Sequence, residues 1–362
     1  MTRYDIAIVG AGIAGASLAA EVAPHASVVI LEAEDQPGYH ATGRSAAFWS
    51  ETYGGPGVQP LTTASGAALR DGGYLDSLGS LHIARREEAA AVAALLAEFA
   101  DSGVALEAVD PREHLAGLRD EWCLGVSEPS CAYIDVGGLH GDYLKAATRA
   151  GARLVLDAVL TSAVREKGMW RLGTKAGEFT ADILVDAAGA WADVVATAAG
   201  ARTLGITPYR RTMVQLRTDP PTVAGMPHVT RIDGAMYFKP EAGGKLWLSP
   251  HDEAPVLPGD VAPEEIDVAV AIDRLEHTVD WRVLAVERKW AGLRSFVPDR
   301  LPVFGFDANR EGFFWCAGQG GFGIQTAPAI SRLAAAALLR TSPHGSVAGI
   351  DSEIYGPGRF AD

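Results

Sequence analysis

The chain has 362 residues, of which 48% are hydrophobic, and a formal net charge of −14 at pH 7. This length predicts two domains, at roughly 100–200 residues each. The negative charge argues against nucleic-acid binding, which needs a basic surface. The sequence contains no uncharged run of about 18 apolar residues, so we expect no membrane span. The three cysteines, Cys123, Cys131 and Cys316, fit no zinc pattern and are typical of free thiols in a reducing compartment. The cysteine spacing therefore predicts no metal site. Since no secretory signal is recognisable before the first strand, we expect a cytoplasmic protein.

The first 32 residues have the pattern of a unit that binds a dinucleotide. A short buried strand leads into the sequence GAGIAG, a GxGxxG, and a helix and a second buried strand follow. Gly10 permits the tight turn, Gly12 lets a pyrophosphate approach the backbone, and Gly15 lets the helix pack closely on the strand. The helix N-terminus offers N–H groups to phosphate, and Glu32 ends the second strand, where a carboxylate can bind a ribose. This context favours a nucleotide site over an ordinary glycine-rich turn.

Beyond this unit, hydrophobic periodicity predicts helices and strands along the rest of the chain. The expected helices cover residues 58–71, 85–102, 262–276 and 327–340, and a further helix, introduced by residues 135–138, ends at 149. The expected strands cover residues 81–84, 153–156, 181–186, 211–216, 235–239, 245–248 and 313–316, with a hairpin over 163–179. The alternation of apolar and polar residues between 207 and 248 predicts an antiparallel sheet with one exposed or ligand-facing side.

These elements predict an α/β fold in which a Rossmann-like nucleotide-binding domain carries an inserted α+β domain built on a mainly antiparallel sheet. The expected nucleotide-binding domain covers residues 1–75, 136–205 and 290–362, and the expected substrate-binding domain covers residues 76–135 and 206–289. A glycine-rich loop at 318–326 links a buried strand to a helix, which is the arrangement of an anion or cofactor cradle.

A second motif, Thr42-Gly43-Arg44-Ser45-Ala46-Ala47, follows the nucleotide-binding unit. Together with GxGxxG and Glu32, it resembles the D-amino-acid oxidase and dehydrogenase family of flavoproteins. Within that family the sequences Gln36-Pro37-Gly38-Tyr39-His40 and Tyr53-Gly54 are most similar to the bacterial D-arginine dehydrogenases. The resemblance implies FAD as cofactor. It also implies that FAD is bound non-covalently, because no cysteine stands where the related sarcosine oxidases tether their flavin.

The resemblance further implies which residues contact FAD. They are Gly10, Gly12, Ile13, Ala14, Gly15, Glu32, Ala33, Thr42, Gly43, Arg44, Ser45, Ala46, Ala47, Val159, Ala188, Gly189, Trp191, Gly292, Arg294, Gly320, Gly321, Phe322, Gly323, Ile324 and Gln325. For the turn at 187–191, packing of a strand against a helix is the alternative explanation, and for the segment at 42–47 it is a surface turn with a solvated arginine.

Four further positions match family residues that bind the substrate. Arg211 and Arg294 suit a carboxylate clamp, because the planar guanidinium bonds a carboxylate through two N–H groups. Tyr53 and Tyr237 match tyrosines whose hydroxyls close over the substrate. Arg210 is a neighbouring candidate, but adjacent strand residues point to opposite faces, so only one of the two arginines can face the ligand. The resemblance favours Arg211.

The expected substrate pocket departs from that of the D-arginine dehydrogenases. Phe48 stands where they have a histidine, and Gly321 lies on the loop expected beside the substrate. Ser80, or a neighbour, stands where they have the glutamate that binds the guanidinium of the substrate. Without that acid a cationic side chain lacks its partner, unless Asp76, Glu87 or Glu88 replaces it. We therefore expect a preference for apolar or uncharged side chains.

The sequence thus predicts a D-amino-acid dehydrogenase or oxidase that transfers a hydride from the substrate CH–NH group to flavin N5. The imino acid so formed hydrolyses to a 2-oxo acid and ammonia, and oxygen or a quinone is the expected electron acceptor. Two alternatives stay open. One is a flavoenzyme of the same family for secondary amines or 2-hydroxy acids, and the other is a flavin-binding protein that has lost catalysis.

Overall fold

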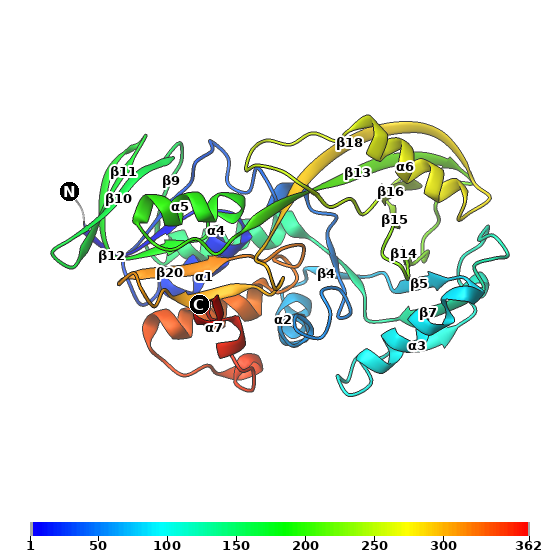
Figure 1. Ribbon diagram of the computed structural model, residues 1–362, viewed down its shortest axis with the longest axis horizontal. Helices are drawn as coiled ribbons and strands as arrows, with labels where there is room; N and C mark the ends of the chain where they lie inside the picture. The colour runs from blue at the N-terminus through cyan, green and yellow to red at the C-terminus, as the bar shows by residue number, and fades with distance from the viewer. Residues whose placement is uncertain (1–2, 361–362) are drawn as a thin grey trace.

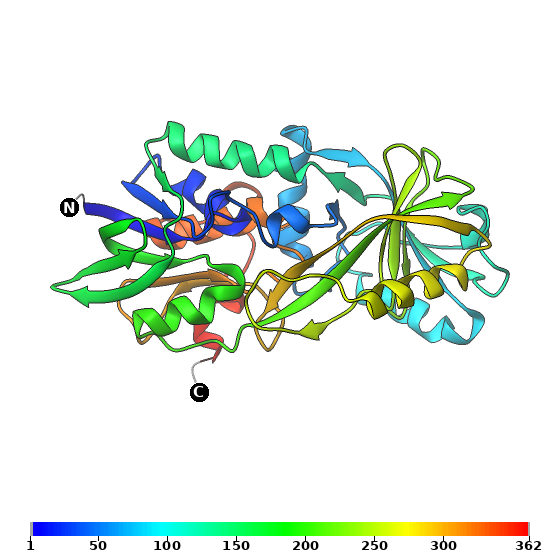
Figure 2. The ribbon, with the colours of Figure 1, turned by 90° about the horizontal axis from the view of Figure 1, so that it is seen from above.

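The computed structural model describes residues 3–360, which form an elongated molecule of two lobes (Figure 1). Each lobe is built on its own large β-sheet, and both described ends of the chain lie in the first lobe (Figures 1 and 2). Residues 1–2 and 361–362, at the outer limits of the expected nucleotide-binding domain, lie outside the described residues. Within the described part, no helix is long and apolar enough to cross a membrane.

The first lobe is organised around a mixed sheet of eight strands. Its central strand, β1 (Arg3–Val9), is parallel to β2 on one side and to β12 on the other. Six strands follow the order β10-β11-β12-β1-β2-β9. The other two strands continue from β12, because β20 pairs with β12 and β19 pairs with β20. The bounds are β2 (Val28–Leu31), β9 (Arg153–Val155), β10 (Leu160–Glu166), β11 (Met169–Thr174), β12 (Gly177–Asp186), β19 (Val303–Phe306) and β20 (Phe313–Ala317).

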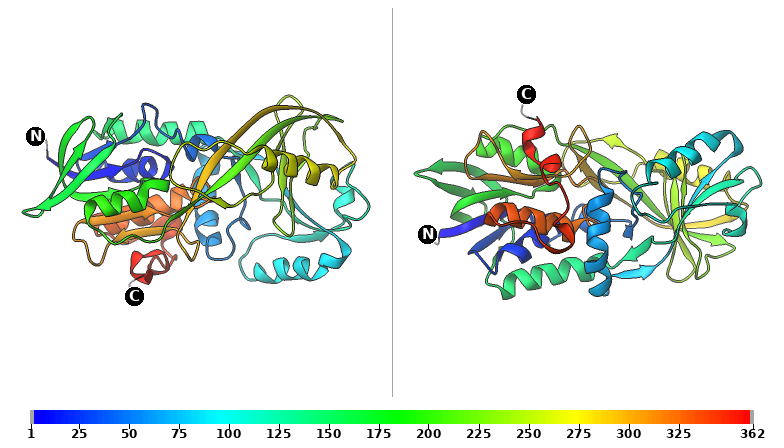
Figure 3. Two further views of the ribbon diagram at one scale, coloured as in Figure 1. Left: turned by 45° about the horizontal axis from the view of Figure 1, so that its top comes forward. Right: turned by 90° about the horizontal axis from the view of Figure 1, so that it is seen from below.

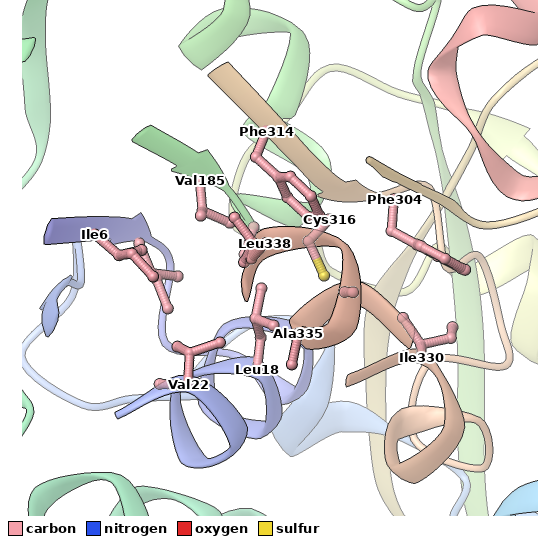
Figure 4. Packing of buried hydrophobic residues seen from close by; sticks show 14 of the residues in the cluster. Ile6, Leu18, Val22, Val185, Phe304, Phe314, Cys316, Ile330, Ala335 and Leu338 are labelled. Atoms are coloured by element: carbon pink, nitrogen blue, oxygen red, sulfur yellow. The ribbon is translucent and has the colours of Figure 1, made fainter. Parts of the chain in front are cut away.

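Helices cover both faces of this sheet because alternate strand residues are buried on opposite sides. On one face α1 (Ile13–Val22), α4 (Val136–Arg149) and α7 (Ala327–Leu339) enclose a core in which Leu18 and Val185 are fully buried (Figure 4). On the other face α5 (Ala192–Ala199) packs over the antiparallel strands β10 and β11. The helix α2 (Gln59–Asp71) lies at the junction of the two lobes (Figure 3).

The second lobe contains a nine-stranded sheet in which β14 and β5 are parallel and the other pairs are antiparallel. Its strands are β5 (Ser80–Ala84), β6 (Glu107–Val109), β7 (Leu124–Glu128), β13 (Thr207–Asp219), β14 (His228–Arg231), β15 (Tyr237–Glu241), β16 (Lys245–Ser249), β17 (Ala254–Pro255) and β18 (Arg282–Phe296). Helices α3 (Ala89–Glu98) and α6 (Glu265–Glu276) pack on it. A small three-stranded sheet contains β3 (Phe48–Trp49), β4 (Leu75–Ser77) and β8 (Ala132–Ile134).

The expected fold class is confirmed, and the structure adds details that local pattern did not contain. The long strands β13 and β18 pair along their whole length and run from the junction into the second lobe (Figures 1 and 2). The domain boundary expected at residue 290 therefore falls inside β18. The helix expected over 85–102 is shorter, because residues 86–88 form a 3₁₀ turn and α3 ends at Glu98. The hairpin expected over 163–179 is formed by β10 and β11, and its last residues, 177–179, belong to β12 together with the strand expected after it.

Candidate active site

A cavity of about 400 Å³ opens at the carboxyl ends of the parallel strands in the first lobe and extends to the paired strands β13 and β18. Ligands of open α/β sheets bind outside the carboxyl ends of the strands, because the loops and helix N-termini meet there. Its two ends differ in chemistry. One is formed by glycines, small residues and Glu32, and the other by aromatic rings and two arginines.

At the first end, close backbone approaches shape a cradle that side chains would fill. Gly10 has φ +100°, and a Cβ there would lie 2.5 Å from the carbonyl oxygen of Ala187. A Cβ on Gly15 would lie 2.0 Å from the oxygen of Gly10, so the helix packs on the turn as the motif predicted. The buried Glu32 carboxylate accepts the N–H of Ala11 at 2.7 Å and lines the cavity at the end of β2.

The segment at 42–47 forms the side of the cradle. Thr42 Oγ1 accepts the N–H of Ile13 at 3.0 Å, and Thr42 therefore ties this segment to the start of α1. The Arg44 guanidinium forms an ion pair with Asp260 at 2.6 Å and donates to the carbonyl of Ala291 at 3.2 Å. Arg44 therefore fastens the segment to the second lobe while its side chain lines the cavity.

The structure brings most of the expected FAD-contacting residues to this one cavity. Those that line it are Gly10, Gly12, Ile13, Ala14, Glu32, Ala33, Thr42, Arg44, Ser45, Ala46, Ala47, Val159, Ala188, Gly189, Trp191, Gly292, Arg294, Gly320, Gly321, Gly323 and Ile324. Gly15, Gly43, Phe322 and Gln325 lie behind its wall. Gly43 closes a turn with its N–H on the oxygen of Gly38, and Phe322 packs with Val58 and Phe296. Gln325 is almost fully buried and donates to the carbonyl of Tyr53 at 3.1 Å, so it holds the Tyr53 loop.

At the other end, the register of β13 and β18 decides which arginine faces the cavity. Arg211 lies opposite Gly292, and Arg294 is two residues further along β18, so Arg211 and Arg294 share a face. Arg210 lies opposite Leu293, and its guanidinium forms ion pairs with Glu264 and Asp267 on the far side. The expectation that Arg210 binds the substrate therefore does not fit its position.

The two cavity arginines are only 6% and 8% exposed, and each keeps a buried N–H without a partner among the described residues. Those free donors are Nη2 of Arg211 and Nε of Arg294. Of the other donors, Arg211 Nε donates to the carbonyl of Asp252 at 3.1 Å, Arg294 Nη1 donates to the hydroxyl of Tyr53 at 3.3 Å, and Arg294 Nη2 donates to the Glu253 carboxylate. Burial raises the pKa of Tyr53, but Arg294 and Arg211 outweigh this and bring it below its ordinary value.

Aromatic and apolar side chains form the rest of this end. The hydroxyl of Tyr237 donates to the sulfur of Met213 at 3.1 Å. The ring of Phe48 packs on Tyr53 and Tyr237, with centroids 5.2 and 5.8 Å apart, and lies tilted against the ring of His228 at 4.5 Å. Burial, with a smaller effect of His82, lowers the pKa of His228 to about 3, so this imidazole is neutral. The pocket wall is thus apolar next to the two guanidiniums.

Neither Ser80 nor any of the three acids expected as alternatives, Asp76, Glu87 and Glu88, places a carboxylate in the cavity lining. Ser80 is buried outside the cavity and bonds to Nδ1 of His228 at 3.0 Å. Glu88 accepts the N–H of Arg85 at 2.7 Å at the start of a 3₁₀ turn.

Sequence reasoning missed two residues that build this site. Met213 faces the cavity two positions after Arg211, and strand alternation alone could have found it. Glu128 is fully buried and accepts the hydroxyls of Ser50 and Thr52 at 2.9 and 2.6 Å, which fixes the loop before Tyr53. Nothing in its local sequence indicated this role, because the partners are about 76 residues away.

Comparison with known proteins places these features in a family. The family model of FAD-dependent oxidoreductases, DAO, matches residues 5–337. A glycine oxidase of Geobacillus kaustophilus is 26% identical, with 92% of each chain covered. A crystal structure of glycine oxidase from that organism has a TM-score of 0.84 at 23% identity and covers 98% of both chains. The crystal structure of L-proline dehydrogenase from P. horikoshii has a TM-score of 0.86 at 20% identity, covering 99% of this chain and 98% of that one. These two structures share the fold of this chain.

Proposed function

The chain belongs to the DAO family of FAD-dependent oxidoreductases, and from that premise we propose that it oxidises the CH–NH bond of a D-amino acid or a related amine. The product is an imine, which water hydrolyses to a 2-oxo acid and ammonia. Bound FAD supplies the oxidising power by accepting a hydride. The observation that carries the proposal is the pair of buried guanidiniums, Arg211 and Arg294, each with a free N–H at the end of a nucleotide cavity. The glycine oxidase and proline dehydrogenase similarities support amino acids as the substrate class.

FAD fits the residues of the first end. The bare backbone at Gly10 and Gly12 leaves room for a pyrophosphate beside the N-terminus of α1, whose N-cap makes no side-chain hydrogen bond. Each oxygen of the Glu32 carboxylate already accepts one N–H and keeps a lone pair for a ribose hydroxyl. No cysteine lines the cavity, which supports the prediction that FAD is held without a covalent bond.

The residues of the second end would bind and orient the substrate. A substrate carboxylate that accepts the free N–H groups of Arg211 and Arg294 would be held by two desolvated cations, where electrostatic attraction is stronger than in water. The Tyr53 hydroxyl already accepts from Arg294 and can donate to the same carboxylate. With the carboxylate fixed, Phe48 and Met213 form an apolar wall for the substrate side chain.

We also propose that the enzyme prefers apolar or uncharged side chains to those of D-arginine and D-lysine. A cationic side chain in this pocket would lack a partner, which costs several kcal/mol, whereas an apolar one gains about 25 cal/mol per Å² buried. We expect kcat/KM for D-leucine, D-phenylalanine or D-methionine to exceed that for D-arginine at least tenfold, measured with an artificial electron acceptor. If D-arginine is the best substrate of this panel, the account of the pocket wall is wrong.

Anaerobic bleaching of the bound flavin tests the proposed function itself. The panel contains these D-amino acids, their L-enantiomers, glycine, L-proline and D-lactate. Bleaching by D-amino acids, and not by the L-forms, supports the proposal. Bleaching by L-proline or D-lactate alone favours a secondary-amine or 2-hydroxy-acid enzyme. A yellow, folded protein that none of these compounds bleaches is a flavin-binding protein without this activity.

A further inference from the structure

A fixed carboxylate, Glu253, contacts both arginines of the clamp and belongs to no strand or helix. Its Oε1 bonds Nη2 of Arg294 and lies 3.8 Å from Nη2 of Arg211. The same carboxylate accepts two N–H groups of Arg300, at 2.8 and 3.3 Å, on the solvent side. Glu253 does not line the cavity, so it meets the guanidiniums from outside, and neither Nη2 of Arg211 nor Nε of Arg294 makes a hydrogen bond to it.

The backbone around Glu253 is anchored on both sides, so this carboxylate is a built part of the site. The preceding residue, Asp252, accepts the N–H of Thr212 at 2.7 Å and its hydroxyl at 2.9 Å. The following residue, Ala254, pairs with Arg210 in the register of β17 and β13. A segment held in this way cannot withdraw Glu253 from the clamp without breaking strand contacts.

The charges at the clamp limit how many carboxylates a substrate can bring. Two adjacent guanidiniums repel each other, and the pKa of Arg211 is lowered by burial and by Arg294. Burial raises the pKa of Glu253, but Arg300 and Arg294 outweigh this and lower it to about 2, so Glu253 stays anionic. Three guanidiniums, of Arg211, Arg294 and Arg300, meet two carboxylates here, of Glu253 and of Asp252, which lies 3.8 Å from Nε of Arg211. The balance leaves one positive charge for the substrate. From behind the guanidiniums, the negative charge of Glu253 lowers the positive potential that a second substrate carboxylate would experience in the cavity.

Among residues 3–360, no other free cation lines this end of the cavity to receive a second carboxylate. His228 is neutral, and burial, with Arg211 next, lowers the pKa of His251 to about 3. Arg44, the remaining arginine that lines the cavity, is paired with Asp260. Resting on the proposed function, we propose that Glu253 is a specificity-determining residue that restricts the substrate to amines with a single carboxylate and excludes dicarboxylic ones.

The test measures binding of simple acids to the flavin-loaded enzyme through the visible absorbance of the flavin, at constant ionic strength. Propionate and succinate are a matched pair, since succinate is propionate with one added carboxylate. We expect the wild type to bind propionate at least tenfold more tightly than succinate. Glu253→Gln should reduce this ratio to about twofold or less by tightening succinate. Glu264→Gln is the matched control, because it removes the same charge from a carboxylate that pairs with Arg210 outside the cavity, and it should leave the ratio unchanged.

Several results would overturn the inference. A wild type that binds succinate as tightly as propionate refutes it without any variant. So does an unchanged ratio in Glu253→Gln, or an equal tightening of both acids, which would make Glu253 a competitor for any carboxylate. If the amide variant does not fold, Glu253→Ala provides the same test. A flavin-loaded wild type that binds neither acid contradicts the clamp and therefore the proposed function, which is distinguishable from an unchanged ratio.

Discussion

Replacing Arg211 and Arg210 separately with glutamine tests the assignment of the clamp on two adjacent residues. The side chains leave β13 on opposite faces, one toward the cavity and one toward Glu264 and Asp267. Arg211→Gln removes a desolvated cation and its free N–H. Arg210→Gln removes an equal charge from the same strand but leaves the cavity wall in place. Asp252 keeps its bonds to Thr212 in that variant.

The magnitude follows from what remains after each change. In Arg211→Gln the substrate carboxylate keeps Arg294, so it loses one of two charge-assisted partners in a site where both guanidiniums are less than a tenth exposed. Loss of one buried charged partner costs about 2–5 kcal/mol, and the retained arginine places the expected value near about 2–3 kcal/mol. This corresponds to a roughly 30- to 150-fold fall in kcat/KM. For Arg210→Gln we expect kcat/KM within about threefold of the wild type and a lower Tm, because Glu264 and Asp267 lose their partner.

Steady-state kinetics with an artificial electron acceptor and the best D-amino acid of the panel measure both variants. The flavin content of each purified protein, read from its visible absorbance, is the control for cofactor loss. A normal kcat/KM in Arg211→Gln, or equal losses in the two variants with full flavin content, would refute the reasoning from strand register.

Three further predictions rest on separate parts of the structure. Gly321→Ala should lower kcat/KM at least tenfold with flavin retained, because the new Cβ would lie 2.2 Å from the Tyr53 hydroxyl. In a Tyr53→Phe background the same substitution should cost less, and equal losses of kcat/KM in both backgrounds would contradict the clash. Burial raises the pKa of Asp186 well above its ordinary value, so its contribution to stability is present below about pH 4 and is lost as the pH rises toward the folded-state pKa. Asp186→Asn should therefore flatten the fall in unfolding free energy between pH 5 and pH 8, measured by urea denaturation, whereas an identical slope would refute this. Acid or heat should release intact FAD from the yellow protein, since no cysteine lines the cavity; flavin that stays attached to the denatured chain would show a covalent link.

Local sequence predicted the parts of the protein that depend on neighbours along the chain. The turn at Gly10 needs a positive φ and a bare backbone, and both requirements are written in GxGxxG. The alternation along β13 allowed only one of Arg210 and Arg211 to face a ligand, because consecutive strand residues point to opposite sides. The helices α2 and α7 begin and end within one residue of the expected positions, since their apolar faces have the helical period.

Tertiary structure decided everything that depends on residues far apart in the chain. Gln325 lies in a glycine-rich loop expected at the cofactor, yet it holds the Tyr53 loop, 272 residues away. Glu253 reaches Arg294 across 41 residues of chain, and only the pairing of β13 with β17 and β18 brings their segments together. Local periodicity determines which face of a strand a side chain takes, but the charge partner that it meets there is set by long-range packing. The sequence by itself therefore determined the nucleotide-binding unit and which of two adjacent arginines the proposed clamp can use, whereas the balance of charge around these guanidiniums was decided by the tertiary fold.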